Sequence, residues 1–185
     1  MAAAPTNSLL RPLRRTEYDQ LVELGAFIEE HVELLDGALV TTSPAGPQHA
    51  SVVQRLTELL VLRLAGRASV RVQSPFAAGP VSEPEPDLAV VPPGSYDTAH
   101  PDRAHLIVEV AKASLLRDLI DKARIYAECQ VPEYWLVNLV ERRLEVHRDP
   151  RDGAYRNVTV LQDGEATVTL CEFPDVCLRL DRIVS

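Results

Sequence analysis

The segment His105–Ala111 constrains the fold more than any other part of the chain. Its sequence, HLIVEVA, is almost entirely apolar, which is typical of a strand buried on both faces of a sheet. A helix predicted from about Leu115 to Cys129 follows, and then a strand predicted over Glu133–Leu139. We therefore expect one strand–helix–strand unit at the centre of a sheet.

Shorter elements are predicted on both sides of this unit. Thr16 and Asp19 resemble a capping box, Asp36-Gly37 is a typical hairpin turn, and Gly66 ends an apolar pattern with helical spacing. The elements expected before the unit are a helix from Thr16 to about Leu24, a hairpin over Val32–Thr42, a helix from His49 to about Leu64, and strands over Ser69–Ser74 and Leu88–Val91. The strands expected after it are Leu144–Arg148, Tyr155–Leu161 and Ala166–Leu170.

The loops between these elements are polar. Gly79–Pro86 is rich in Pro and Glu and too poor in apolar residues to be core, and Gly94–Arg103 is a polar loop. No internal repeat or long linker divides the chain.

The order of the predicted elements indicates a single α/β (α+β) domain over residues 15–185, after an N-terminal tail of residues 1–14. We expect a central mixed β-sheet flanked by helices, with hairpins at both ends.

Composition narrows the class of protein. Of the 185 residues, 46% are hydrophobic and 25% charged, as in a folded globular domain, and no apolar run is long enough to span a membrane. No secretory signal is recognisable at Met1–Asn7, so a cytoplasmic location is expected.

The chain has three cysteines, Cys129, Cys171 and Cys177. Their odd number and the absence of CxxC spacing indicate buried thiols rather than disulfides or a zinc site.

The net charge of −8 counts against a simple nucleic-acid-binding protein. An acidic enzyme can still act on DNA if basic groups line one cleft and its acidic groups lie elsewhere or hold cations. The distribution of charge in space therefore decides this question.

Two carboxylates lie at strand positions where they need a compensating partner. Asp87 stands at the start of the strand Leu88–Val91, and Glu109 lies inside HLIVEVA, where burying a carboxylate is costly unless a cation or a hydrogen bond compensates it. On adjacent strands they would form an oxygen-rich site for Mg²⁺ or Mn²⁺, which polarises a phosphodiester and activates water.

Lysine is rare in this chain. Of the 19 Lys and Arg residues only Lys112 and Lys122 are lysine, which leaves 17 arginines. A lysine kept in so Arg-rich a sequence indicates a place where a compact ammonium is needed, because the two side chains are not interchangeable at a crowded site.

Several of these segments together resemble a known family. The runs EPEPDLAVV and LIVEVAKASLLRDLIDKARIYAECQVPEYWLVN, with VELLDGALVTTSPAGPQHASVV before them and ERRLEVHRDPRDGAYR after them, closely resemble the Uma-two family of putative restriction endonucleases. That family belongs to the PD-(D/E)XK nuclease superfamily. The resemblance covers roughly residues 15 to 180.

This resemblance implies a restriction-endonuclease-like fold and a metal-dependent nuclease acting on DNA. Asp87 and Glu109 would be metal ligands, Glu33 would complete the metal shell, and Lys122 would be the catalytic lysine. The superfamily usually places this lysine two residues beyond the glutamate, where this chain has Ala111. Lys112 should point to the opposite face of the strand, because side chains alternate. The Uma-two family has the lysine on the following helix, at the position of Lys122.

Less specific interpretations of the same residues stay open. Glu109 could be a structural carboxylate paired with Arg124 or Arg117. Asp118 and Lys122, four residues apart, could both face the site or form a surface ion pair. His49 could contact phosphate or metal, or could serve only in capping or packing. The aromatic residues Tyr126, Tyr134 and Trp135 are expected in the core behind the site.

These residues are compatible with three functions. The first is a metal-dependent DNA endonuclease that uses Asp87, Glu109 and Lys122. The second is a non-catalytic nucleic-acid or protein-interaction module on a nuclease scaffold, and the third is a phosphohydrolase for a smaller substrate. A homodimer is also expected, because two-fold symmetry suits cleavage of both strands of a duplex.

Overall fold

One six-stranded sheet organises the fold. The computed structural model describes residues 11–41, 45–111, 116–162 and 164–184, without the side chains of residues 116–119. The strands of the sheet, in their spatial order, are β3 (Ser69–Val72), β4 (Leu88–Val91), β5 (Leu106–Ala111), β6 (Glu133–Asn138), β7 (Arg143–Arg151) and β8 (Ala154–Leu161). Strands β5 and β6 run parallel and all other neighbours antiparallel, so the sheet is mixed, as expected.

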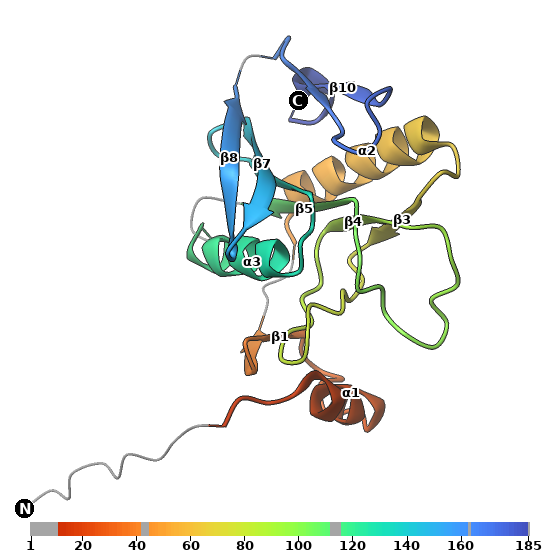
Figure 1. Ribbon diagram of the computed structural model, residues 1–185, viewed down its shortest axis with the longest axis vertical. Coiled ribbons are helices and arrows are strands. Elements are labelled where there is room, and N and C mark those ends of the chain that lie inside the picture. Colours follow the sequence, from red (N-terminus) through yellow and green to blue (C-terminus); the bar gives the residue numbers. More distant parts are fainter. Residues whose placement is uncertain (1–10, 42–44, 112–115, 163, 185) are drawn as a thin grey trace, which may run out of the picture.

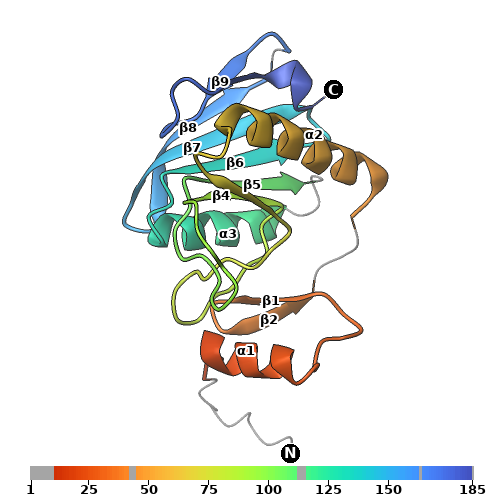
Figure 2. The ribbon, with the colours of Figure 1, turned by 90° about the vertical axis from the view of Figure 1, so that its right-hand side faces the viewer.

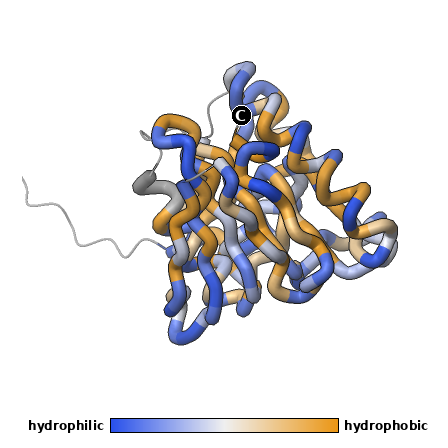
Figure 3. The backbone as a smooth tube through the Cα atoms, turned by 90° about the horizontal axis from the view of Figure 1, so that it is seen from above, coloured by the Kyte–Doolittle hydropathy of each residue, from blue (hydrophilic) through white to orange (hydrophobic). Residues whose placement is uncertain are grey.

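Two helices cover opposite faces of this sheet (Figures 1 and 2). Helix α2 (Pro47–Leu64) packs on one face, and α3 (Leu116–Glu128), which connects β5 to β6, packs on the other. Side chains of β5 alternate between the two cores: Val108 belongs to the core beneath α2, and Ile107 to the core beneath α3. Hydrophobic and hydrophilic segments alternate along the chain in Figure 3. Burial on both faces explains why every residue of β5 except Glu109 is apolar.

Smaller elements lie at the two ends of the molecule (Figures 1 and 2). At one end, α1 (Arg15–Glu23) packs beside the hairpin of β1 (Val32–Leu35) and β2 (Ala38–Thr41). The predicted turn of this hairpin is confirmed, since Asp36 and Gly37 both have positive φ, 51° and 77°. The opposite end holds β9 (Thr167–Thr169), β10 (Cys177–Arg179) and a 3-10 turn over Leu180–Arg182; β10 was not predicted.

The predicted starts of two helices are wrong. The backbone N–H of Arg14 donates to the carboxylate of Glu17, so α1 is capped two residues earlier than the Thr16–Asp19 pattern indicated. Helix α2 begins at Pro47, before His49, because proline has no N–H to leave unpaired at the first helical position.

The prediction that Gly79–Pro86 lies outside the core is also wrong. Ser82, Glu83, Pro84 and Pro86 are buried. The backbone of Glu83 forms a two-way bridge with Leu34, donating at 2.7 Å and accepting at 3.4 Å. This segment is buried because it joins the N-terminal hairpin to the rest of the molecule, which its polar composition did not reveal.

The cysteines are free thiols, but two of them are not buried. Cys171 and Cys177 are exposed and Cys129 is partly buried, so the expectation of three buried thiols is wrong. Cys177 lies in β10 on the face opposite the buried Leu178, and Cys171 lies in the bend after β9. Among the described residues, no helix has the length and apolar character needed to cross a membrane.

Candidate functional site

Asp87 and Glu109 lie side by side on neighbouring strands. Leu88 of β4 pairs with Val108 of β5, so the antiparallel register places Asp87 opposite Glu109. Both are buried, with exposed fractions of 8% and 5%. The backbone N–H of Val110 donates to Oδ2 of Asp87 at 2.8 Å, which attaches this carboxylate to β5.

Helix α3 brings a cation and a hydroxyl to Glu109. The ammonium Nζ of Lys122 lies 3.2 Å from Oε1 of Glu109, and the hydroxyl of Tyr126 donates to the same oxygen at 2.7 Å. Lys122 and Tyr126 are four residues apart and therefore share one face of the helix. That face is turned toward the sheet because α3 crosses over between β5 and β6.

Glu33 reaches the same lysine from the N-terminal hairpin. Its Oε1 lies 2.8 Å from Nζ of Lys122 and also accepts a hydrogen bond of 2.9 Å from the backbone N–H of Glu85. Glu33 and Lys122 have exposed fractions of 3% and 8%, so this ion pair is buried. We call Glu33, Asp87, Glu109, Lys122 and Tyr126 the acid–lysine cluster.

His49 stands on the other side of Asp87. It lies in the first turn of α2, and its Nε2 is 3.0 Å from Oδ2 of Asp87, the oxygen that also accepts the N–H of Val110. Since the carboxylate can only accept, the imidazole donates. The hydrogen bond with Asp87 raises the pKa of His49, against the opposing effect of burial.

The ionisation of the cluster follows from its burial. Burial raises the pKa of the Glu109 carboxyl to about 7, and the nearby Lys122 ammonium limits this rise. For Lys122 burial lowers the pKa, but the carboxylates of Glu109 and Glu33 outweigh it and the pKa is raised. Lys122 is therefore a permanent cation at neutral pH.

From the sequence, Tyr126 was expected to be a core residue and was not assigned to the site. Tyr126 is fully buried, as expected, but its hydroxyl also contacts Glu109. The signal was its spacing of four residues from Lys122 on the same helix. The suggested structural pairing of Glu109 with Arg124 is wrong, because Arg124 pairs with Asp36 and Glu128. The side chains of Asp118 and Arg117, and all of Lys112, lie outside the described residues.

The donor set fits a small hard cation. The contacts described above all use Oδ2 of Asp87 and Oε1 of Glu109, so within the described ranges Oδ1 of Asp87 and Oε2 of Glu109 accept no hydrogen bond. No three His, Cys, Asp or Glu side chains of the described residues gather as metal ligands. Mg²⁺ accepts one or two carboxylates when water or phosphate supplies the other oxygens, so two carboxylates are sufficient.

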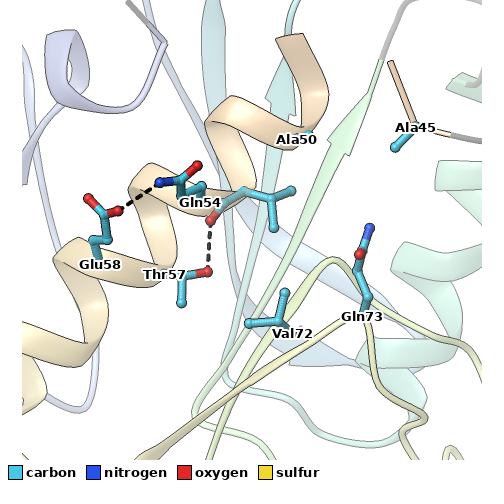
Figure 4. Close-up of a pocket in the computed structure, with 8 residues that line it drawn as sticks. Ala45, Ala50, Gln54, Thr57, Glu58, Val72 and Gln73 are labelled. Carbon is cyan, nitrogen blue, oxygen red and sulfur yellow. Dashed lines mark hydrogen bonds between the residues drawn. The ribbon is translucent and has the colours of Figure 1, made fainter. Parts of the chain in front are cut away.

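A groove of about 330 Å³ lies beside Asp87, between α2 and the end of β3 (Figure 4). Gln73 lines it and donates its backbone N–H to the carbonyl of Asp87, which connects the groove to the acid–lysine cluster. Gln54 also lines it and donates to Glu58, the one charged side chain among the described lining residues. The described lining residues therefore offer apolar, amide, hydroxyl and carboxylate groups and no basic side chain.

The mixed sheet, with two acids on neighbouring strands and a lysine on the adjacent helix, is the arrangement of the restriction-endonuclease-like class. The chain belongs to the Uma2 family, described as "Putative restriction endonuclease", whose family model matches residues 16–181.

The fold is shared with a solved structure, a putative nuclease belonging to DUF820 from Anabaena variabilis ATCC 29413. The two chains superpose with a TM-score of 0.76 at 14% sequence identity, covering 94% of this chain and 98% of the other. At this identity the likeness shows the fold alone. Among curated proteins, none matches this chain.

Proposed function

We propose that this protein is a metal-dependent endonuclease that hydrolyses phosphodiester bonds in DNA. The observation that carries the proposal is the acid–lysine cluster, in which Asp87 and Glu109 lie opposite each other and Lys122 neutralises Glu109. A lysine buried with two carboxylates is costly in a purely structural role, because replacing such groups by apolar ones is often neutral or stabilising. Membership of a nuclease family supports a nucleic acid as substrate.

Each side chain has a distinct part in this proposal. Asp87 and Glu109 hold the cation through Oδ1 and Oε2, which accept no hydrogen bond from the described residues. Lys122 stabilises negative charge that develops on the phosphate, because the carboxylates of Glu109 and Glu33 raise its pKa and favour the ammonium form. Tyr126 and His49 are positioning residues, since each holds one oxygen of a carboxylate and so orients the other.

Mg²⁺ or Mn²⁺ is the cation that we propose for this site. When bound, it would supply charge stabilisation for the phosphate and lower the pKa of the attacking water. Calorimetric titration with MgCl₂ or MnCl₂ tests this separately from activity. We expect binding to the wild type and its loss in Asp87→Asn and Glu109→Gln.

The test of function is cleavage of plasmid and linear DNA with MgCl₂ or MnCl₂. We expect Asp87→Asn, Glu109→Gln and Lys122→Met each to lower the rate by about 10²-fold or more, since each removes a charge from the reacting centre. Glu128→Gln, an exposed acid on the same helix as Lys122, is the matched control and should cleave normally. Circular dichroism establishes that each variant is folded. Cleavage that persists in EDTA, or in folded Glu109→Gln, would contradict the proposal.

A phosphohydrolase for a smaller substrate is the second candidate. One observation favours it: the groove beside Asp87 carries Glu58 and no basic side chain among its described lining residues, while the net charge of the chain is −8. A surface that binds duplex DNA is usually lined by Lys and Arg side chains, which contact the phosphates. A panel of mononucleotides and short oligonucleotides separates the two candidates, because a small-substrate enzyme would cleave these and leave duplex DNA intact.

A further inference from the structure

A second cavity, of about 500 Å³, lies apart from the groove beside Asp87. It is bounded by α1, by the start of β1 and by the loop over residues 96–100, which are distant in sequence. Glu83, from the buried segment that bridges to Leu34, forms part of its wall. None of the described side chains of the acid–lysine cluster lines it.

Glu83 is the unusual residue of this cavity. It is only 3% exposed, yet its Oε2 has no hydrogen-bond partner among the described residues. Nη1 of Arg15 lies 3.6 Å from Oε2, and Nε2 of His100 lies 3.8 Å from Oε1, both too far for a hydrogen bond. The Nε of Arg15 donates instead to the carbonyl of Gly79. Among the described residues, this buried carboxylate oxygen in the cavity wall therefore has only a long ion pair with Arg15 and accepts no hydrogen bond, a state that normally has an explanation.

The surroundings of Glu83 are acidic. Asp19 and Glu85 also line the cavity, and Arg15 is its single arginine among the described lining residues. Burial, followed by the charge of Asp19, raises the pKa of the Glu83 carboxyl to about 7. Near neutral pH this carboxyl is thus held close to ionisation, and a cation beside it would favour the charged form.

Aromatic side chains complete the lining. Tyr18, Phe27 and Tyr96 all line the cavity, and the rings of Tyr18 and Phe27 are stacked at 5.7 Å between centroids. Aromatic faces attract organic cations as well as apolar groups. The acids and histidines here do not form a cluster of three or more metal ligands within the described residues. Carboxylates beside aromatic rings suit an organic cation better than a metal ion.

We propose that this cavity is a binding site for a compact organic cation, a primary amine or a guanidinium, whose N–H groups donate to Glu83. The carboxylate of Asp19 adds a second attraction, and the aromatic rings cover the carbon skeleton. The cavity shares no described lining side chain with the acid–lysine cluster, and it adjoins the cluster through Glu85, whose backbone N–H donates to Glu33.

The test is an NMR titration of the full chain with agmatine, which carries a guanidinium and a primary amine, in buffer with about 0.15 M NaCl to screen unspecific attraction. We expect saturable shifts with a Kd of about 1 mM or lower. Glu83→Gln should weaken binding by about tenfold or more, and Asp19→Asn by about threefold, because each removes a charged acceptor. Asp19 is on the half-buried surface of α1, so its variant keeps the proposal testable if Glu83→Gln does not fold.

Glu58→Gln, in the groove beside Asp87, and Glu109→Gln are the controls and should bind agmatine as the wild type does. The proposal is overturned if agmatine produces no saturable shift, if NaCl at equal ionic strength reproduces the shifts, or if folded Glu83→Gln binds equally well. Loss of nuclease activity in Glu109→Gln with intact agmatine binding would show that the two sites fail separately.

Discussion

Replacing Lys122 by methionine removes the ammonium of the acid–lysine cluster but keeps a long apolar side chain. The ammonium lies 2.8 Å from Glu33 and 3.2 Å from Glu109, and the residue is only 8% exposed. Removing one partner of a buried ion pair costs about 3–5 kcal/mol, because its former partners either stay buried as uncompensated charges or must take up a proton. We expect Lys122→Met to lower the free energy of unfolding by that amount at pH 8.

The loss should depend on pH. Burial raises the pKa of the Glu109 carboxyl from 4.5 to about 7, so in the wild type ionisation of Glu109 opposes folding. That contribution to stability is fully present below pH 4.5 and is lost as the pH rises through 7. Without Lys122 the pKa of Glu109 rises further and its proton stays bound at pH 8. From pH 7 to pH 8 the variant should lose about 1.4 kcal/mol of stability, whereas the wild type, already near its Glu109 pKa, should lose about 0.4 kcal/mol. The variant's loss relative to the wild type should therefore be about 1 kcal/mol smaller at pH 7 than at pH 8.

Urea unfolding at pH 7 and pH 8, followed by circular dichroism in the presence of EDTA, measures both quantities. Arg124→Met is the matched control on the same helix, since Arg124 pairs with Asp36 and Glu128 near the surface and should cost less than about 1 kcal/mol. A loss below about 1 kcal/mol for Lys122→Met, or an equal loss at the two pH values, would refute the reasoning.

Three further substitutions and one measurement follow from the same structure. Tyr126→Phe removes the hydrogen bond to Glu109 and should lower kcat about tenfold in the DNA cleavage assay while KM changes little. Gly37→Ala should cost more than about 1 kcal/mol in urea unfolding, because φ there is 77° and a Cβ would overlap Pro12. Burial raises the pKa of Glu83 to about 7, so its ionisation opposes folding as the pH rises from 4.5 through 7. The free energy of unfolding of Glu83→Gln should therefore exceed that of the wild type by about 1–3 kcal/mol at pH 8, and by less at pH 5. Light scattering should give the mass of a homodimer, and a monomer at about 10 μM would remove that proposal.

The central part of this fold could be predicted from the sequence because its residues are decided by local pattern. Strand β5 is apolar on both faces, α3 follows it, and the hairpin turn at Asp36-Gly37 requires positive φ at both positions. The juxtaposition of Asp87 and Glu109 was predicted as two carboxylates on adjacent strands, and the register places them opposite each other.

Other features depend on contacts that no local pattern encodes. The Pro- and Glu-rich segment is buried because Glu83 bridges to Leu34, about fifty residues away in the chain. The contact of Tyr126 with Glu109 depends on how α3 is rotated over β5, which the helical spacing allowed but did not require. Cys171 is exposed in the bend after β9, outside the strand itself, and its residue type did not reveal this position.

The ion pair between Glu33 and Lys122 also has a consequence for folding. It joins residues 89 positions apart, and one partner belongs to a hairpin outside the main sheet. Closing so long a loop is among the slow steps of folding, because its entropy is lost before the contact is gained. A chain whose hairpin has formed early must wait for β5 and α3 before Glu33 meets its partner. The charged centre is therefore complete only after the hairpin, β5 and α3 have come together, and a chain in which they are still apart carries all of its residues without the site that they make.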